Sequence, residues 1–313
     1  YHENQRGIKA GYAKFETFPI WNLPLKHPVN IAYESATADL GDFNQVDPFH
    51  LKAYGVTAVN YNRDVEVFPI LKKIMKRIRG NGMTYNSPTD MGVNKAGFAI
   101  IDDALVRKAA RQEIIRRFLR YSCEYAMGVA SKKTVQRAEL LMKELNLGPT
   151  DRDVVNPARD ASVEAKKKEK GNENVFAGAA LKLDDGTIVK GKNSSLMHSA
   201  SSLILNAIKE LAGIPDDIHL LSPNILRSIS NLKEEFFNHK RLSLNLEETL
   251  IALSISADFN PSAKAAMEKL KDLKGCEMHS THIPTPGDEA GLRRLGLNVT
   301  SDPNYSSKRL FIT

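Results

Sequence analysis

The densest run of chemically capable side chains lies near residue 280. Cys276, His279 and His282 stand at three-residue intervals, so one thiol and two imidazoles fall within seven residues. Thiolate sulfur and imidazole nitrogen are preferred ligands of Zn²⁺, and the spacing therefore raises the hypothesis of a metal site. The stretch follows a helical pattern that ends in Gly275, which favours a strand for it.

A strand would separate these three side chains. Its side chains alternate between two faces, so His279 points away from Cys276 and His282. Six residues of strand put Cys276 and His282 about 20 Å apart, whereas a zinc ligand lies about 2.0–2.3 Å from its ion. The sequence also lacks the His-Glu-x-x-His motif of zinc peptidases and the paired motifs of zinc deaminases. We therefore predict no metal ligands and disfavour zinc as a cofactor.

What remains of the motif is His279-Ser280-Thr281 at the C-terminal end of the expected strand. Open α/β sheets place ligand-binding groups at such ends, and these three residues form a candidate ligand pocket with Lys192 and Asn193. The alternative is a core histidine whose ring nitrogens are satisfied by its neighbours. Ser280 stands in no Gly-x-Ser-x-Gly elbow, so nucleophilic catalysis has no support.

A second concentration of polar side chains lies in the first hundred residues. The candidates for catalysis are Asp39, Asp47, His50, Asp64 and Asp90, and the candidates for ligand binding are Asn60, Asn62 and Arg63. An arginine pairs with anions through two hydrogen bonds, carboxylates hold Mg²⁺ or act as bases, and a histidine serves as acid or base. The set suits a polar or phosphorylated ligand, such as a nucleotide with Mg²⁺.

Each of these residues also has a structural explanation. Asp64 would cap a helix, Asp39 would sit in a turn, and Asn60 and Asn62 would form loops. The sequence contains neither Gly-x-x-x-x-Gly-Lys-Ser/Thr nor Gly-x-Gly-x-x-Gly, so these 313 residues carry no phosphate cradle of their own.

Composition limits the class of protein and its partners. The chain has 313 residues, 42% hydrophobic and 26% charged, which predicts a globular protein of two or three compact units. No apolar run approaches the roughly 20 residues of a membrane span, and no secretory signal is visible. Two distant cysteines form no disulfide framework and fit a reducing cytoplasm.

The net charge of +7 comes largely from two runs, Leu71–Gly80 and Glu164–Gly171. In both runs the basic residues alternate with apolar or acidic ones at helical spacing, which favours a solvated helix face or a linker over a phosphate-binding track. No interleaving of aromatic and basic residues for base stacking occurs. Nucleic acid is therefore an unfavoured partner.

The elements that must position these residues form three stretches: 1–98 with short elements, 99–172 with helical periodicity, and 173–313 with alternating strands and helices. We predict a strand and a proline-rich loop over 10–25, a helix over 27–40, and over 54–82 a strand or loop that runs into a helix closed by Gly80 or Gly82. Helices follow over 102–128 and 131–148, then a hairpin turning at Asp185-Gly186, a helix over 192–213 capped by Asn193 or Ser194, and a strand over 218–223. The last elements are helices over 245–259 and 260–275, a strand over 276–283, a helix over 288–296 and a strand over 297–303. The pattern predicts a mixed α/β (α+β) fold: a small α/β piece, a helical bundle and a layered α/β domain.

Several long stretches resemble a known family. The segments GIKAGYAKFETFPIWNLPLKHPVNIAYESATADL, DPFHLKAYG, VNYNRDVEVFPIL, SPTDMGVN, GKNSSL and HST, the last followed by LRRLGLNVTSDP, are similar to the bacterial proteins grouped as domain of unknown function 1846. The resemblance covers nearly the whole chain. It implies an N-terminal nucleotide-binding-like region with a Gly-rich loop that precedes these residues, so that 1–98 completes that region, and a C-terminal domain with cytidine-deaminase-like topology. Some members carry the label ATP-dependent zinc peptidase, which the residues here do not support.

Three functional hypotheses follow. The first is a cytoplasmic enzyme that binds a nucleotide or a small phosphorylated metabolite through the N-terminal set. The second is a non-catalytic ligand-binding or assembly protein, in which the His279 pocket is regulatory and the chain forms a homo-oligomer. The third, which the motifs disfavour, is a metal-dependent hydrolase or peptidase.

Overall fold

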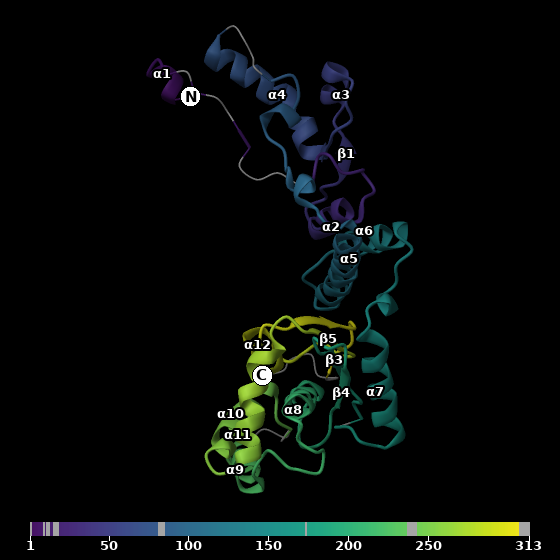
Figure 1. Ribbon diagram of the computed structural model, residues 1–313, viewed down its shortest axis with the longest axis vertical. Coiled ribbons are helices and arrows are strands. Elements are labelled where there is room, and N and C mark those ends of the chain that lie inside the picture. The colour runs from purple at the N-terminus through teal and green to yellow at the C-terminus, as the bar shows by residue number, and fades with distance from the viewer. Residues whose placement is uncertain are drawn as a thin grey trace. The chain divides into compact units, whose positions relative to one another are not determined.

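The computed structural model describes residues 2–8, 10, 13–14, 19–80, 85–172, 174–236 and 243–306. Contacts divide the chain into two compact units (Figure 1). Unit 1 comprises residues 1–121 and 128–148, and unit 2 comprises residues 122–127 and 149–313. The mixed α/β class is confirmed, whereas the division into 1–98, 99–172 and 173–313 stays a prediction.

Unit 1 contains mostly helices and one small sheet. Its elements are α1 (His2–Gln5), α2 (Pro28–Ala36), β1 (Asn44–Val46), α3 (Pro48–Tyr54), β2 (Val59–Tyr61), α4 (Asn62–Arg79), two 3₁₀ helices (Thr89–Met91 and Ala96–Ala99), α5 (Asp103–Ala126, whose last residues belong to unit 2) and α6 (Lys132–Glu144). Strands β1 and β2 pair antiparallel, with Asn44 opposite Tyr61 and Val46 opposite Val59. The predicted helices at 27–40, 102–128 and 131–148 are confirmed, as is the strand or loop that runs into a helix over 54–82.

Local signals in the sequence explain where these helices begin. Pro28 occupies the first turn of α2, and the Nδ1 atom of His27 accepts a hydrogen bond from the amide of Val29 at 3.3 Å. Asp47 and Ser131 cap α3 and α6 in the same way, by accepting bonds from backbone amides of the first turn. Of the strand and proline-rich loop predicted at 10–25, residues 11–12 and 15–18 lie outside the described residues.

Unit 2 is a layered α/β structure. Its elements are η3 (Pro149–Asp151), α7 (Val155–Lys167), β3 (Gly178–Lys182), β4 (Ile188–Lys192), α8 (Ser199–Ala212), α9 (Pro223–Glu235), α10 (Leu246–Ala257), α11 (Pro261–Glu268), η4 (Lys269–Leu273), β5 (Glu277–Ser280), α12 (Pro286–Arg294) and β6 (Asn298–Ser301). The sheet order is β4-β3-β5-β6, in which only β5 and β6 are parallel. The predicted hairpin and the strands near 279 and 300 are confirmed, and the likeness to cytidine deaminases stays a prediction.

Two glycines allow helices to lie directly against opposite faces of this sheet. A Cβ atom on Gly178 would stand 2.3 Å from the carbonyl oxygen of Ala158 in α7, and one on Gly191 would stand 2.4 Å from the amide nitrogen of Leu203 in α8. In Figure 1, α7 and α8 flank the strands of unit 2 accordingly. The main core lies on the α8 side and includes Leu181, Leu253 and Met278.

Two details of the predicted secondary structure are wrong. Helix α8 begins at Ser199, after His198, instead of near Asn193. The side chain of Asn193 instead accepts a hydrogen bond from the amide of Ala177 at 2.8 Å and so joins two strand ends. No strand forms at 218–223: Leu220 and Leu221 pack in the main core without pairing to a strand, and Pro223 starts α9. None of the helices among the described residues is both long and apolar enough to cross a membrane.

Candidate functional site

Four of the predicted residues of unit 1 meet in one hydrogen-bond network. Asp47 precedes α3, His50 lies in its first turn, Asn60 lies in β2, and Asp90 belongs to the 3₁₀ helix Thr89–Met91. These segments are separated by up to 43 positions in the chain, so the fold and not the local sequence brings them together.

Asp47 fastens two of these segments to each other. Its Oδ1 atom accepts hydrogen bonds from the amides of Phe49 at 2.9 Å and His50 at 3.1 Å. Its Oδ2 atom accepts bonds from the amide of Thr89 at 3.2 Å and from its hydroxyl at 2.5 Å. The residue is fully buried, and Asn60 donates to the same hydroxyl at 3.3 Å. Because every acceptor direction of Asp47 is used within the protein, its contacts favour a structural role over that of a base.

His50, Tyr54 and Asp90 form the outer part of the network. The Oδ2 atom of Asp90 accepts hydrogen bonds from the Tyr54 hydroxyl at 3.0 Å and from the amides of Asn86 and Ser87 at 2.7 and 3.1 Å. The Nδ1 atom of His50 lies 3.0 Å from the Ser87 hydroxyl and 3.6 Å from Asp90 Oδ1.

This arrangement of serine, histidine and aspartate differs from a catalytic triad. In a triad the serine contacts Nε2 and the aspartate contacts Nδ1, whereas here both partners approach Nδ1 of His50. Ser87 is fully buried. The Nε2 atom of His50 makes no hydrogen bond within the described part of the chain, so it is the nitrogen that a ligand would meet.

Aromatic rings surround His50. Its ring centroid lies 4.8 Å from that of Tyr54 and 6.3 Å from that of Trp21, and Trp21 lies 6.4 Å from Phe98. Tyr54 and Phe98 are 48% and 70% exposed, so the array reaches the surface. The indole Nε1–H of Trp21 is buried and has no hydrogen-bond partner among the described residues.

The other predicted residues of unit 1 lie outside this network. Their contacts are those of Asp39 with the Tyr121 hydroxyl at 3.3 Å, Asn62 with the amide of Phe43 at 2.9 Å, Arg63 with Asp42 at 2.7 Å and Asp64 with Lys14 at 2.8 Å. No lysine or arginine of the described ranges forms an ion pair with Asp47 or Asp90. Among the described residues the network is therefore rich in acceptors and holds no lysine or arginine.

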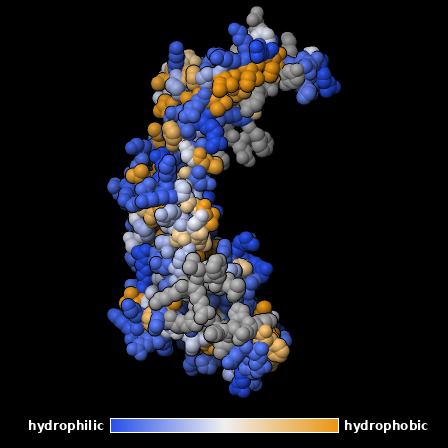
Figure 2. All heavy atoms as spheres, turned by 180° about the vertical axis from the view of Figure 1, so that it is seen from behind, coloured by the Kyte–Doolittle hydropathy of each residue, from blue (hydrophilic) through white to orange (hydrophobic). Residues whose placement is uncertain are grey.

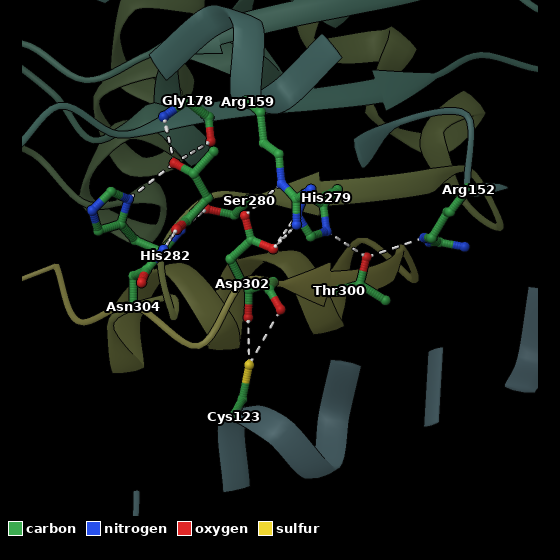
Figure 3. A network of polar contacts seen from close by, with 12 residues as sticks. Cys123, Arg152, Arg159, Gly178, His279, Ser280, His282, Thr300, Asp302 and Asn304 are labelled. Carbon is green, nitrogen blue, oxygen red and sulfur yellow. Dashed lines mark hydrogen bonds and ion pairs between the residues drawn. The ribbon is translucent and has the colours of Figure 1, made fainter. Parts of the chain in front are cut away.

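A second polar network lies in unit 2, where the C-terminal ends of the parallel strands β5 and β6 meet (Figure 3). The Nδ1 atom of His279 lies 3.0 Å from the Thr300 hydroxyl, and its Nε2 atom lies 3.5 Å from Asp302 Oδ1. Arg159 of α7 reaches the same carboxylate with two hydrogen bonds, of 3.0 Å from Nε and 2.7 Å from Nη2. Figure 3 shows the side chains of His279 and Arg159 converging on Asp302.

The charges of this network follow from its contacts. Although burial disfavours the ionised carboxylate, the interactions with His279 and Arg159 outweigh it and lower the pKa of Asp302 to about 2. Burial lowers the pKa of His279, whose side chain is inaccessible to solvent. The Thr300 hydroxyl donates to the carbonyl oxygen of Met278 at 3.1 Å, so its oxygen is the acceptor for Nε of Arg152 and faces Nδ1 of His279.

Arg152 completes the interior side of this network. Its Nε atom donates to the Thr300 hydroxyl at 3.1 Å, its Nη2 atom donates to the carbonyl oxygen of Asn298 at 3.0 Å, and its guanidinium pairs with Glu277. The side chain is 1% exposed. These bonds tie β5 to β6, so the contacts of Arg152 are those of a structural residue.

The remaining residues of the predicted pocket contact the protein in different places. The Thr281 hydroxyl accepts a hydrogen bond from the amide of Gly178 at 2.9 Å, whereas Lys192 pairs with Glu164 at 2.5 Å. Ser280 accepts a long bond of 3.4 Å from the amide of His282. Ser280 and Thr281 follow His279 directly in the sequence, whereas Lys192 and Asn193 bond to other groups.

The residues of the opening motif also separate. Cys276 lies 3.9 Å from Asp184, and Nδ1 of His282 lies 2.9 Å from the Thr281 hydroxyl. Within the described residues, no three side chains of His, Cys, Asp or Glu lie close enough together to hold a metal ion.

Sequence reasoning missed Tyr54 and Trp21 in unit 1 and Arg159 and Asp302 in unit 2. Asp302 had a usable signal, because it lies near the C-terminal end of a predicted strand just as Ser280 does, and parallel strands bring such ends together. Tyr54 lies four residues after His50 on α3, a spacing that places both rings on one helix face.

Comparison with known proteins gives the family. The descriptions "Domain of unknown function DUF1846, N-terminal" and "Domain of unknown function DUF1846, C-terminal" match residues 1–146 and 150–311. A UPF0371 protein of Clostridium botulinum (strain Alaska E43 / Type E3) is 55% identical over 311 residues, which cover 99% of this chain and 62% of that protein. A UPF0371 protein of Clostridioides difficile (strain 630) is 53% identical over 311 residues, with the same coverage.

The chain therefore spans about three-fifths of the length of the curated relatives it matches. The resemblance that the sequence suggested is confirmed over both halves of the chain. This protein belongs to the family described as domain of unknown function DUF1846.

Proposed function

We propose that this protein is a cytoplasmic enzyme that binds a nucleotide or a small phosphorylated metabolite, and that unit 1 holds the uncharged ring and hydroxyl part of the ligand. The observation that carries the proposal is the outer network of His50, Tyr54 and Asp90, which has unused hydrogen-bonding capacity at an aromatic surface. The cytoplasmic location is inferred from the two unpaired cysteines.

The negative charges of Asp47 and Asp90 favour a position for the ligand's phosphate away from these two carboxylates. Two unit negative charges 4 Å apart repel by about 4 kcal/mol at an effective dielectric constant of about 20, and no described cation offsets Asp47 or Asp90. Hydroxyl groups, by contrast, donate readily to a carboxylate. A phosphate near Asp90 would therefore require Mg²⁺, which takes one or two carboxylates together with phosphate oxygens.

The aromatic array suits the ring of such a ligand. Stacking of a base on an aromatic side chain contributes about 1–3 kcal/mol, and the half-exposed Tyr54 and the exposed Phe98 offer faces for it. His50 Nε2, which is free of described partners, is the proposed acid or base. Asp90 would orient the ligand hydroxyls.

The alternative of a regulatory pocket around His279 has less support. His279 is fully buried, and Asp302 and Thr300 already occupy the positions around its ring. Lys192 and Asn193, the other proposed members, bond to Glu164 and to backbone groups.

The test is a thermal-shift screen of the full-length protein against nucleotides and sugar phosphates, with and without Mg²⁺. A ligand at 100 times its Kd stabilises the folded state by about 2.7 kcal/mol. For a ligand that stabilises the wild type, Asp90→Asn and His50→Gln should each weaken binding about tenfold or more, because each removes an acceptor or donor at the site.

Asp39→Asn is the matched control, since Asp39 is a carboxylate of the same unit outside the network. The proposal fails if no compound of the panel shifts the melting temperature. It also fails if the Asp90 and His50 variants bind as tightly as the Asp39 variant.

A further inference from the structure

A further histidine–aspartate pair lies in unit 2, outside both networks described above. The Nδ1 atom of His198 lies 2.7 Å from Asp288 Oδ2. Asp288 is 4% exposed, and its carboxylate also accepts hydrogen bonds from the Thr285 hydroxyl at 2.7 Å and from the amide of Leu246 at 2.9 Å. Because an ionised carboxylate only accepts hydrogen bonds, Nδ1 of His198 is its third donor.

This pairing leaves the other ring nitrogen of His198 open. Its Nε2 atom makes no hydrogen bond within the described ranges, and its side chain is 28% exposed. A carboxylate on one ring nitrogen fixes the tautomer and the orientation of a histidine, so that the other nitrogen meets the ligand. Among the described residues no three metal-ligating side chains gather here, so the chemistry of the pair suits a ligand other than a metal ion.

His198 stands immediately before α8, whose first turn lacks hydrogen-bond acceptors. Its side chain bonds to Asp288 and does not cap the helix. The amides of Ser199, Ala200 and Ser201 donate to no acceptor in the part of the chain that the structure describes, although these three residues are only 6%, 5% and 0% exposed. Buried N–H groups are almost always paired, so this turn is built to receive an acceptor.

The hydroxyl of Ser199 points to a ligand independently of these amides. Ser199 is the first residue of α8, and the Cα–Cβ bonds of a helix tilt towards its N-terminus. Its side chain therefore extends to the end of the helix that the free amides face. Its nearly buried hydroxyl has no hydrogen-bond partner among the described residues, whereas Ser201 of the same turn donates to the carbonyl oxygen of Leu244 at 3.1 Å.

Electrostatics favour an anion at this end of α8. The N-terminus of a helix carries roughly half a positive charge and binds anions through its free N–H groups. Asp288 is a negative neighbour, but its charge is already compensated, because it lies in the first turn of α12 and accepts from the first amide of α10. A phosphate monoester offers three free oxygens, against two for a carboxylate, and so matches better a set of three amides, a hydroxyl and a ring nitrogen.

We propose that His198, Ser199 and the first turn of α8 bind the phosphate group of a small phosphorylated molecule. In either protonation state Nε2 of His198 forms a hydrogen bond with the phosphate: it donates when protonated, and otherwise accepts from the remaining hydroxyl of the phosphate. The amides and the Ser199 hydroxyl donate to the other oxygens. Because His198 is partly exposed, the rest of the ligand extends into solvent.

The surface around the site agrees with a charged ligand. In Figure 2 the broad hydrophobic band lies over α4 of unit 1, whereas the face of unit 2 in the lower part of the view is largely hydrophilic. The site lies in a different unit from the aromatic network of His50. It therefore does not rest on the function proposed above, and it remains if unit 1 binds nothing.

Chemical modification of the histidines of the full-length protein tests this site. Diethyl pyrocarbonate acylates unprotonated ring nitrogens, and mass spectrometry of peptides reports each histidine separately. At constant ionic strength, replacing chloride with inorganic phosphate should slow the reaction of His198 by about tenfold at ten times the Kd, since only the free site reacts. His219, an exposed histidine of the same unit, is the internal control and should react equally fast in both salts.

One variant then tests the assignment of the donors. Ser199→Ala removes the hydroxyl and keeps a good helix former, so it should raise the Kd for phosphate protection about tenfold. Ser254→Ala, at an exposed position of α10, is the matched control and should leave the Kd unchanged. Glycerol 3-phosphate should protect His198 as inorganic phosphate does, because its ester leaves three phosphate oxygens free.

Four results would overturn the proposal. The first is an unchanged reaction of His198 in phosphate, which would leave water as the partner of the free amides. The second is equal protection by acetate, which would show a general effect of anions. The third is an equal Kd for Ser199→Ala and Ser254→Ala, and the fourth is protection by inorganic phosphate without protection by glycerol 3-phosphate. The first two are measured on the wild type, so they do not depend on the folding of a variant.

Discussion

Asp302 should stabilise unit 2 in a way that depends on pH. Its pKa is about 2 in the folded protein against a reference value of 3.8, and one pKa unit corresponds to about 1.4 kcal/mol. The ionised side chain therefore contributes on the order of 2 kcal/mol to the free energy of unfolding. Because the folded pKa is the lower one, this contribution is complete above about pH 4 and is lost as the pH falls towards 2.

The perturbation is Asp302→Asn, which removes the charge and keeps the size of the side chain. At pH 7 we expect the free energy of unfolding of unit 2 to fall by about 2 kcal/mol, since Arg159 and the buried ring of His279 then face a neutral amide. Near pH 2 the carboxylate of the folded wild type is about half protonated and that of the unfolded chain is almost fully protonated, so most of the contribution is lost and the difference between wild type and variant should shrink. Asp160→Asn changes an exposed carboxylate next to Arg159 on α7 and serves as the control.

The assay must report on unit 2 alone. Trp21, the only tryptophan, belongs to unit 1, so its fluorescence in urea should not change with the Asp302 variant. Hydrogen exchange of peptides covering residues 277–302, measured by mass spectrometry across urea and pH, follows β5 and β6. A stability difference that is the same at pH 7 and near pH 2, or no larger than that of Asp160→Asn, would refute the assignment of Asp302 as the charged centre of this network.

Two further predictions concern packing. Asp47→Ala should lower the free energy of unfolding of unit 1 by about 3 kcal/mol, because it removes a helix cap and leaves the buried amide of Thr89 without its acceptor. Urea titration followed by Trp21 fluorescence measures this loss. A loss below about 0.5 kcal/mol would contradict the structural role of Asp47. Gly178→Ala should destabilise unit 2 by about 1–3 kcal/mol or more, because its Cβ would overlap the backbone of α7 at Ala158. Hydrogen exchange of β3 measures the second effect, and unchanged protection would show that α7 shifts freely.

The sequence predicts a helix or a turn well where the residues that define it are close neighbours in the chain. Pro28 at the start of α2, Asp185-Gly186 in the hairpin and Asn260 before α11 each act within a few residues, and the structure confirms all three. Asn193 was misjudged because an asparagine before a helical pattern resembles a cap. In the fold it bonds to Ala177 and Val175, partners that become neighbours only when the hairpin forms.

The site residues show the same limit more sharply. The position of His279 at a strand end could be predicted from the strand itself. Its partner Asp302 could not be assigned, because that contact depends on the parallel pairing of β5 with β6 and on the approach of Arg159 from α7. The residue types that can do chemistry are visible in the sequence, whereas the partners that use up their hydrogen-bonding capacity are not.

The two networks differ in how much hydrogen-bonding capacity their side chains have left for a ligand. In the network of unit 2, Asp302 already has Arg159 beside it, and Glu277 has Arg152. A ligand arriving there would have to replace bonds that hold β5 and β6 together, and breaking a buried pair costs about 3–5 kcal/mol. In unit 1, His50 Nε2 and the exposed ring of Tyr54 have no such commitment, and Asp90 meets only neutral donors through its Oδ2 atom. A ligand there would gain bonds without breaking any, which is the physical reason for proposing a ligand site in unit 1 and not at His279.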